Sequence, residues 1–263
     1  MDPYDKRPLL AIIGGSGLAK LADLRDPRRQ VVRTPYGDPS GALTFGRLEG
    51  IEVVFLARHG YGHTIAPHEI NYCANIWSLQ HVGVEQVISV ATVGGIGQGC
   101  APGRLVIPDQ VIDYTHGRRS TFFEGAEQPV THVDFTHPYD AALRARLRAA
   151  AERAGDAVID GGTYGCTQGP RLETAAEVRR MQRDGCDIVG MTGMPEAALA
   201  RELQLPYAAL CVVANHAAGC GSSAERISLE AIGAVLDATM SRVRRILVEL
   251  ARDVPAALGR EAP

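Results

Sequence analysis

The 263-residue chain lacks an apolar run long enough to cross a bilayer, which argues against insertion into a membrane. Residues 1–7 are polar and charged. The apolar stretch at 8–13 is too short for the core of a secretory signal and ends in glycines rather than at a cleavage site. We therefore expect a cytoplasmic location.

An excess of charge of one sign is also missing. The 27 Lys and Arg residues nearly balance the 30 Asp and Glu residues, for a formal net charge of -3. Binding to a nucleic-acid backbone needs a clustered basic face, whereas the arginine-rich stretches here are interrupted by acidic residues and alanines. We expect those arginines on solvated helix faces and predict no nucleic-acid partner.

Cysteine pairs with the spacing of a metal site are absent as well. The six cysteines form no CxxC motif, and several lie in apolar stretches: Cys73, Cys100, Cys166, Cys186, Cys211 and Cys220. Reduced, mostly buried thiols are therefore predicted, rather than disulfides or metal ligands.

Short apolar runs typical of strands alternate with stretches in which apolar residues recur at helical spacing. The strand-like runs are Leu9–Ile13, Val53–Ala57, Gln86–Thr92, Ala157–Thr163, Asp187–Gly190 and Ala208–Ala214. The helical stretches are Ile70–Val82, Ala141–Arg153, Thr174–Arg183, Pro195–Glu202 and Ser228–Val248. Because the strand runs are almost continuously apolar, we expect both faces of the sheet to be covered. The pattern predicts a three-layer α/β/α fold with a largely parallel central sheet.

The chain shows no internal repeat, low-complexity segment or linker, so we predict a single domain over residues 1–263. The longest stretch without periodicity is Thr115–Pro138, which is rich in His, Thr and Phe. Long loops of this kind are often functional.

The first predicted strand ends in a glycine-rich turn, Gly14–Gly17, with the sequence GGSG. Glycines permit positive φ and let backbone N–H groups approach an anion, and the Ser16 hydroxyl adds a directed donor. The spacing differs from the GxGxxG of dinucleotide-binding folds, and no acidic residue closes a second strand at the expected distance. The turn fits an anion site or a tight structural turn.

The tripeptide Arg58–Gly60, with the sequence RHG, follows the second predicted strand. Its arginine offers a bidentate fork for phosphate, and His59 offers a second donor. A zinc site formed by His59, His63 and His68 is the weaker interpretation. Glycines and a proline between these histidines break any helical face, and no Cys or carboxylate partner is evident.

Residue types that bind anions or expose backbone amides stand at four predicted strand ends: Ser16, Arg58, Ala91–Thr92 and Thr192. In parallel α/β sheets, ligands gather at the carboxyl ends of the strands. Any one of these ends is weak evidence, whereas their convergence predicts one site.

Three further motifs follow along the chain, and each also has a structural explanation. They are TQGPRLET at Thr167–Thr174, GMTGMPE at Gly190–Glu196 and VVANHAAG at Val212–Gly219. Thr174 or Glu173 can cap the helix that follows, and Asn215 can occupy a turn. The order of the motifs along one chain is the stronger signal.

Together, the motifs GGSG, RHG, HEINY, GPRLETAAE and GMTGMPEA and the strand ending in Asn215 resemble the trimeric purine nucleoside phosphorylase/methylthioadenosine phosphorylase family. The resemblance runs from about Ile12 to Val248 and is strongest to the bacterial members that act on S-methyl-5′-thioinosine. It implies a homotrimer with active sites at subunit interfaces. It also implies inorganic phosphate as a co-substrate, and neither a metal nor an organic cofactor.

The resemblance also assigns site residues by position. It implies phosphate contacts by Ser16, Arg58, His59, Ala91, Thr92 and Thr192, and base contacts by Leu172, Glu173, Asn215 and Ala217. It implies contacts to the ribose or its 5′ group by Met191, His132, Leu229 and Ile232. His132 would reach the sugar bound by the neighbouring subunit, and Glu196 would lie on the helix behind Met191. Asn215, Glu173 and Arg58 would carry catalysis.

Glu173 and Asn215 favour a 6-oxopurine as the leaving base. An ionised Glu173 accepts the ring N–H of a 6-oxopurine but meets a lone pair on adenine. The Asn215 amide donates to the oxygen and to the imidazole-ring nitrogen. The adenosine-specific members of the family carry aspartates where this chain has Asn215 and Ala217, and no glutamate at Glu173. Sites built around hydrogen bonds discriminate by about 10⁴–10⁵, so we expect hypoxanthine rather than adenine.

The 5′ substituent is assigned from apolar residues. Leu229 and Ile232 suit a methylthio group, whereas a 5′-hydroxyl would need a polar partner such as His63 or His132. We therefore expect phosphorolysis of S-methyl-5′-thioinosine to hypoxanthine and 5-methylthio-ribose 1-phosphate. The alternatives are a general inosine/guanosine phosphorylase, a methylthioadenosine phosphorylase and a non-catalytic nucleoside sensor, although a sensor would not need phosphate ligands. A nicotinamide-dependent oxidoreductase would need the fingerprint that is missing after Gly17.

Overall fold

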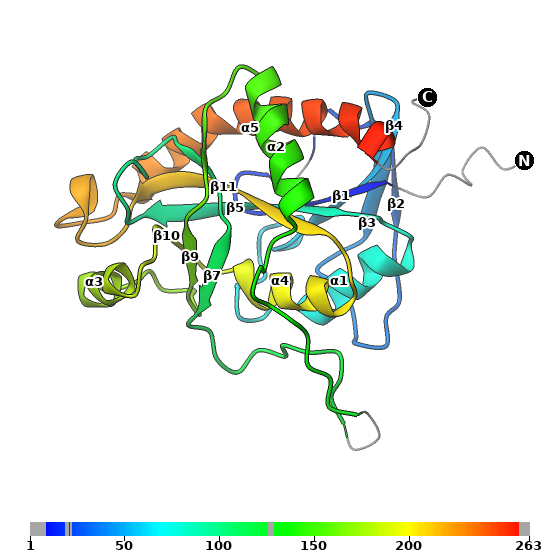
Figure 1. Cartoon of the computed structure of the whole chain (residues 1–263), viewed down its shortest axis with the longest axis horizontal. Coiled ribbons are helices and arrows are strands. Elements are labelled where there is room, and N and C mark those ends of the chain that lie inside the picture. The colour runs from blue at the N-terminus through cyan, green and yellow to red at the C-terminus, as the bar shows by residue number, and fades with distance from the viewer. Residues whose placement is uncertain (1–8, 19–20, 22, 126–128, 258–263) are drawn as a thin grey trace, which may run out of the picture.

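One mixed β-sheet runs through the part of the chain that the structure describes, residues 9–18, 21, 23–125 and 129–257 (Figure 1). In this computed structural model the strands are β1 (Leu10–Gly14), β2 (Arg25–Gln30), β3 (Leu43–Leu48), β4 (Ile51–Ala57), β5 (Val87–Gly95), β6 (Leu105–Ile107), β7 (Gln110–Asp113), β8 (Val158–Asp160), β9 (Thr163–Cys166), β10 (Ile188–Gly190) and β11 (Tyr207–His216).

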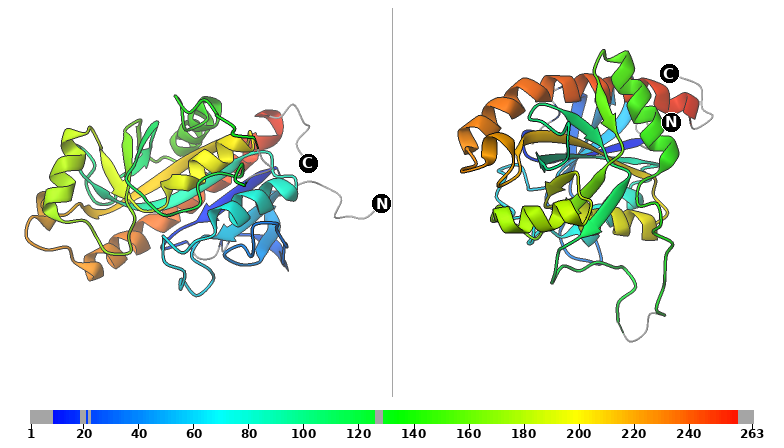
Figure 2. Two further views of the ribbon diagram at one scale, coloured as in Figure 1. Left: turned by 90° about the horizontal axis from the view of Figure 1, so that it is seen from below. Right: turned by 60° about the vertical axis from the view of Figure 1, so that its left-hand side comes forward.

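Helices cover both faces of this sheet, and the predicted three-layer α/β/α architecture is confirmed. The helices are α1 (Tyr72–His81), α2 (Ala141–Arg153), α3 (Ala175–Arg183), α4 (Gly193–Glu202) and α5 (Leu229–Ala257), with a 3₁₀ turn at Gly221–Ser223. Figure 2 shows α2 and α5 on one face and α1 and α4 on the other. Among the described helices, none is both long and apolar enough to span a bilayer.

Alternate side chains of the central strands point into two separate cores. In β1, Leu10 and Ile12 pack with residues of α2 and α5, whereas Ala11 and Ile13 pack with residues of α1 and α4. All four side chains are buried. Successive residues of a strand face opposite sides of the sheet, so a strand covered on both faces is apolar throughout.

The sheet is parallel at its centre and mixed elsewhere, because β9 runs parallel to β7 and β10, and β8 runs parallel to β6. β4, β1, β5 and β11 are consecutive neighbours and run parallel, as expected. The pairs β2–β3, β3–β4 and β6–β11 are antiparallel. β10 is also antiparallel to β5, with Val189 opposite Gly94. The carboxyl end of β10 therefore lies beside the middle of β5 and not beside the carboxyl end of β5.

The strand predicted at Ala157–Thr163 is instead two strands with different neighbours. β8 pairs with β6, and β9 pairs with β7 and β10. Between them, Gly161 and Gly162 have φ angles of 103° and 108°, a region that glycine alone adopts readily. β2, β3, β6 and β7 are additional to the predicted strands, and α5 continues past Val248 to Ala257.

Residues 115–138, here called the arm, leave the body of the molecule between β7 and α2. Figure 1 shows the arm projecting beyond α1 and α4. Its described part contains neither helix nor strand. The long non-periodic stretch of the sequence thus begins against the body, where Phe122 is buried in the core, and then extends away from it.

Candidate active site

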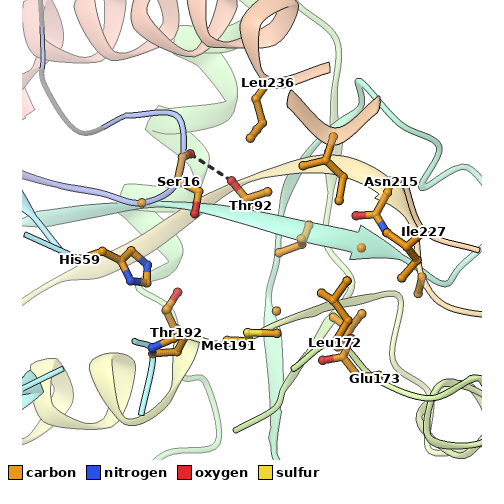
Figure 3. Close-up of a pocket in the computed structure, with 18 of the residues that line it drawn as sticks. Ser16, His59, Thr92, Leu172, Glu173, Met191, Thr192, Asn215, Ile227 and Leu236 are labelled. Carbon is orange, nitrogen blue, oxygen red and sulfur yellow. Dashed lines mark hydrogen bonds between the residues drawn. The ribbon is translucent and has the colours of Figure 1, made fainter. Parts of the chain in front are cut away.

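A cavity of about 210 Å³ lies where the carboxyl ends of β1 and β4 meet β5, β10 and α5 (Figure 3). Most of the predicted site residues line it: Ser16, Arg58, His59, Thr92, Leu172, Glu173, Met191, Thr192, Asn215, Ala217 and Ile232. We call the part formed by Gly15, Ser16, Arg58, His59, Thr92 and Thr192 the anion end. The part formed by Leu172, Glu173, Asn215 and Ala217 is the carboxylate end.

Three predicted residues do not line this cavity: Ala91, His132 and Leu229. Ala91 precedes Thr92 in β5, so its side chain faces the opposite side of the sheet, where it is buried in the core. Leu229 is the first residue of α5, is 73% exposed and lies beyond the edge of the cavity. His132 is exposed on the arm.

Thr192 reaches the anion end by a different route from the expected one. β10 is antiparallel to β5, so Thr192 arrives beside the middle of β5 rather than at its carboxyl end. Thr92 likewise lies inside β5, not after it. The expected convergence of four parallel strand ends is therefore wrong in detail. Ser16 after β1 and Arg58 after β4 do arrive in that way.

Several lining residues were not predicted, among them Gly15, Val189, Ile227 and Leu236. Leu236 follows Ile232 by four residues on α5, and this helical spacing was a usable signal. Ile227 stands in the loop before α5, where the sequence has no periodicity to place it.

Arg58 is fully buried at the anion end, together with Glu196 of α4. Its Nε donates to Glu196 Oε2 at 2.7 Å and its Nη2 to Glu196 Oε1 at 3.0 Å. Nη2 also donates to Ser89 Oγ at 2.6 Å, and Nη1 to the Val90 carbonyl oxygen at 3.0 Å. Burial alone lowers the pKa of the guanidinium, but the Glu196 carboxylate outweighs it and the pKa is raised.

The bidentate fork of Arg58 therefore holds a carboxylate of this chain and is not open to a ligand. These four bonds use four of its five N–H donors. Gly15 lies directly against Nη1, since a Cβ there would stand 2.8 Å from that atom. The glycine-rich turn thus has a structural role, close approach to Arg58, in addition to any role in anion binding.

Hydroxyl groups complete the anion end. Thr92 Oγ1 donates to the backbone carbonyl oxygen of Ser16 at 3.1 Å, which ties the glycine-rich turn to β5. Ser16 Oγ lies 3.4 Å from His63 Nε2. The Thr192 hydroxyl points into the cavity from the opposite side (Figure 3). An anion between these groups would meet the Ser16 and Thr192 hydroxyls as donors, because the Thr92 proton is already used in its bond to Ser16.

His59 is nearly buried and has a defined tautomer. Its Nδ1 lies 2.9 Å from the Ile65 carbonyl oxygen, which can only accept, so Nδ1 carries the proton. Burial, followed by the nearby Arg58 charge, lowers the pKa of His59 to about 4. At neutral pH the ring is therefore neutral, with a lone pair on Nε2. The expectation that His59 offers a donor to phosphate is wrong, because its one N–H is used on Ile65.

A zinc site built from His59, His63 and His68 finds no support in the geometry. The rings of His59 and His63 are 4.6 Å apart. Among the residues that the structure describes, however, no group of three His, Cys, Asp or Glu side chains is arranged to hold a metal ion.

Glu173 does not cap the helix that follows it. Thr174 is the N-cap of α3 and forms a capping box with Glu177. Glu173 instead accepts a hydrogen bond from Thr167 Oγ1 at 2.6 Å and lines the cavity. Its carboxylate is thus a positioned acceptor at the carboxylate end.

Asn215 is aimed by a β-bulge. The register of β11 against β5 shifts between Val213 and Asn215, which brings Asn215 opposite Gly94. Its Nδ2 donates to the His216 carbonyl oxygen at 2.6 Å. Because that carbonyl can only accept, the bond fixes which end of the amide is nitrogen and leaves one N–H for a ligand.

The wall between the two ends is apolar next to α5. Ile227, Ile232 and Leu236 line it, and Figure 3 shows Leu236 pointing toward Ser16 and Thr92. Met191 lies across the cavity from them. This wall suits an apolar substituent of a ligand that extends from the anion end to the carboxylate end.

Comparison with known proteins agrees with this geometry. The family model described as phosphorylase superfamily matches residues 9–252. A protein of Xanthomonas campestris pv. campestris named probable S-methyl-5′-thioinosine phosphorylase is 54% identical, over 92% of this chain and 97% of its own length. The 6-oxopurine nucleoside phosphorylase of Pyrococcus furiosus is 48% identical, over 81% of each chain. The methylthioadenosine phosphorylase of Schistosoma mansoni in complex with adenine superposes with a TM-score of 0.89 at 30% identity, over 97% of this chain and 93% of that one. The chain therefore belongs to the phosphorylase superfamily.

Proposed function

We propose that this chain is a purine nucleoside phosphorylase that converts S-methyl-5′-thioinosine and phosphate into hypoxanthine and 5-methylthio-ribose 1-phosphate. One observation carries the proposal. A single cavity has hydroxyls and one remaining N–H of the paired Arg58 at one end and a carboxylate fixed as an acceptor at the other. The names of the Xanthomonas and Pyrococcus relatives support a 6-oxopurine nucleoside as the substrate.

The carboxylate end fits hypoxanthine better than adenine. Glu173 accepts the ring N–H next to the 6-oxygen. The remaining N–H of Asn215 donates to the purine as negative charge develops on it. Ala217 replaces the second aspartate of the adenosine-specific members. Without the two aspartates, neither position offers an acid that could protonate a leaving adenine.

The apolar wall fits a methylthio group. Leu236, rather than Leu229, joins Ile232 there. Burial of one methyl group contributes about 0.8 kcal/mol, so the preference over a 5′-hydroxyl is modest. The second candidate is a general inosine/guanosine phosphorylase, and the exposed His63 beside Ser16 is the observation that favours it, since its Nε2 could pair with a 5′-hydroxyl.

Catalysis in this proposal rests on positioning rather than on a protein nucleophile. Arg58 Nη1 and the Ser16 and Thr192 hydroxyls hold phosphate beside the sugar. Neutral His59 accepts a hydrogen bond from a phosphate oxygen that carries a proton. The glycosidic bond breaks with its electron pair going to the purine, and the phosphate oxygens stabilise the oxocarbenium-like sugar. A phosphate oxygen then bonds to the anomeric carbon with inversion.

We also propose a homotrimer in which His132 completes the site of a neighbouring subunit. The arm projects from the body, and His132 is exposed in the isolated chain, as such a role requires. The reaction uses no metal or organic cofactor and takes place in the cytoplasm.

Release of free base from S-methyl-5′-thioinosine, inosine and S-methyl-5′-thioadenosine, each with and without phosphate, tests the proposal. We expect phosphate-dependent release that is fastest from S-methyl-5′-thioinosine. Equal rates without phosphate would indicate a hydrolase. Faster release from inosine would favour the general phosphorylase, and faster release from the adenine nucleoside would contradict the assigned base.

A further inference from the structure

Arg118, at the foot of the arm, holds together two segments of the cavity wall. Its Nη1 donates to the carbonyl oxygens of Met191 at 2.8 Å and Met194 at 2.6 Å, after β10. Its Nη2 donates to the carbonyl oxygens of Thr167 at 3.2 Å and Gln168 at 2.8 Å, after β9. The segments after β9 and β10 are therefore fixed to each other through one guanidinium.

The remaining contacts of Arg118 complete this clamp. Nε donates to Gln168 Oε1 at 3.2 Å, and Nη1 also approaches Tyr72 Oη at 3.2 Å. The partners are spread over Nε, Nη1 and Nη2, which the fork of an arginine can satisfy and the single ammonium of a lysine cannot. The side chain is half-buried, so these bonds are partly shielded from water.

Thr167 links this clamp to the residue that reads the base. Its carbonyl accepts from Arg118, its backbone N–H donates to the Gly190 carbonyl oxygen at 2.8 Å, and its Oγ1 donates to Glu173 Oε1 at 2.6 Å. The alternative acceptor for the hydroxyl, the Gly190 carbonyl oxygen, lies further away at 3.3 Å. The main-chain bonds thus set the position from which the hydroxyl meets the carboxylate.

We propose that Arg118 and Thr167 are positioning residues that hold the Glu173 carboxylate as an acceptor, and that they thereby set the discrimination between 6-oxo and 6-amino purines. This inference rests on the proposed function. A hydroxyl has one proton, and Thr167 donates it to Oε1, which fixes the orientation of the carboxylate. A carboxylate freed from that bond can rotate away from the ring N–H of a 6-oxopurine.

The test is the ratio of kcat/KM for S-methyl-5′-thioinosine to kcat/KM for S-methyl-5′-thioadenosine, measured alongside the KM for phosphate. Thr167→Val keeps the shape and removes the donor. Because a hydrogen bond to a charged group is worth about one to two powers of ten, we expect the ratio to fall at least about tenfold. Thr167→Ser retains the hydroxyl and should restore most of the ratio. The KM for phosphate should stay within about threefold in both, because the Thr167 hydroxyl bonds to Glu173 and the Gly190 carbonyl oxygen and not to the anion end.

Arg118→Lys tests the clamp, and Arg119→Lys is its matched control. Arg119 is the adjacent residue of the arm and pairs with Glu124 at 3.0 Å on the surface. Arg118→Lys should lower the ratio of kcat/KM for S-methyl-5′-thioinosine to that for S-methyl-5′-thioadenosine, whereas Arg119→Lys should leave this ratio unchanged. A loss of folded protein alone reduces activity on both nucleosides equally and does not move the ratio.

An unchanged ratio in Thr167→Val would overturn the inference while leaving the proposed phosphorylase in place, and this variant decides the matter if Arg118→Lys does not fold. A lowered ratio that Thr167→Ser does not restore would also overturn it. A wild-type enzyme that releases both bases equally well would overturn the base assignment and the inference together.

Discussion

The two ends of the cavity are built in opposite ways. At the anion end, Arg58 and Glu196 are fully buried, and the glycine-rich turn is pressed against them. At the carboxylate end, Glu173 is half-buried and Leu172 is 41% exposed. The first end is joined to the hydrophobic core, and the second is carried on the loop after β9 and on the end of β11 with the residue that follows it.

This difference corresponds to the two substrates of the proposed reaction, phosphate at the anion end and the purine base at the carboxylate end. Phosphate is the same co-substrate for every base, and the groups we assign to it lie where substitution disturbs the fold. Glu173 lies on a connecting segment and Asn215 lies beside the bulge near the end of β11, and both are only half-buried, so substitution there costs less stability. Changes at the anion end should therefore affect folding, and changes at the carboxylate end should affect turnover and selectivity.

The largest expected effect is on folding, from Glu196→Gln. Arg58 would keep its charge in the core without a carboxylate partner. Breaking one partner of a buried pair costs about 3–5 kcal/mol in the free energy of unfolding. Denaturant unfolding of the variant and the wild type measures the difference.

Arg171→Gln is the matched control, because Arg171 forms a similar bidentate pair with Glu177 on the surface. Its loss should cost much less stability than Glu196→Gln, because water screens an exposed ion pair. Equal losses in the two variants would show that the buried Arg58–Glu196 pair stabilises the fold no more than a surface pair does.

The next effect is on turnover, from Asn215→Ala. Removing one preorganised donor to developing negative charge typically lowers kcat by about 10²–10³. Steady-state kinetics with S-methyl-5′-thioinosine should show that loss in kcat, with an unfolding midpoint close to that of the wild type. If KM alone changes, the leaving-group role of Asn215 is wrong.

A pH-dependent effect on stability is expected from His59. Burial, followed by the Arg58 charge, holds its pKa at about 4, compared with 6.5 for an ordinary histidine. Between these values the unfolded chain binds a proton that the folded chain does not. Stability should therefore fall as the pH drops from 6.5 to 4, by at most about 3 kcal/mol from this group. Above pH 6.5 the group adds no pH dependence.

Urea unfolding at pH 7, 5 and 4 measures this dependence, with His59→Asn as the comparison. The variant should lose less stability than the wild type over that range. The same loss in both proteins would show that His59 is not the group responsible.

The smallest effect concerns the apolar wall. Ile232→Val removes one methylene-sized group, worth about 0.8 kcal/mol or roughly a fourfold change in a rate ratio. We expect kcat/KM for S-methyl-5′-thioinosine relative to inosine to fall by that factor. Leu229→Val, outside the cavity, should leave the ratio unchanged, and a larger change there than in Ile232→Val would mean that the wall is wrongly assigned.

The central layers of the fold were predictable because burial on both faces leaves a continuous apolar run, as in β1 and β4. β2 was not predictable in the same way, since all six of its residues are exposed. The three residues of β10 carry no sequence pattern from which its antiparallel direction could be predicted. This direction depends on how β9 and β5 present their edges to β10.

The residue types of the site were also visible in the sequence, but their pairings were not. Arg58 was recognised as a phosphate-type residue, yet its fork is filled by Glu196, 138 positions away. Thr167 stands within a motif that the sequence already singled out, although its contact with Glu173 requires the folded loop. Arg118 lies on a stretch without periodicity, where no pattern distinguishes it from Arg119.

The pairing of Arg58 with Glu196 leaves the anion end of the cavity without net charge from these two residues. Phosphate would then be held by directed donors instead of by a net positive charge, so its affinity should depend little on ionic strength. After each proposed turnover the phosphate group is part of the sugar product and must leave. An anion end without net charge lets that product dissociate. The ion pair that stabilises the core therefore also shortens the time for which the sugar phosphate stays bound.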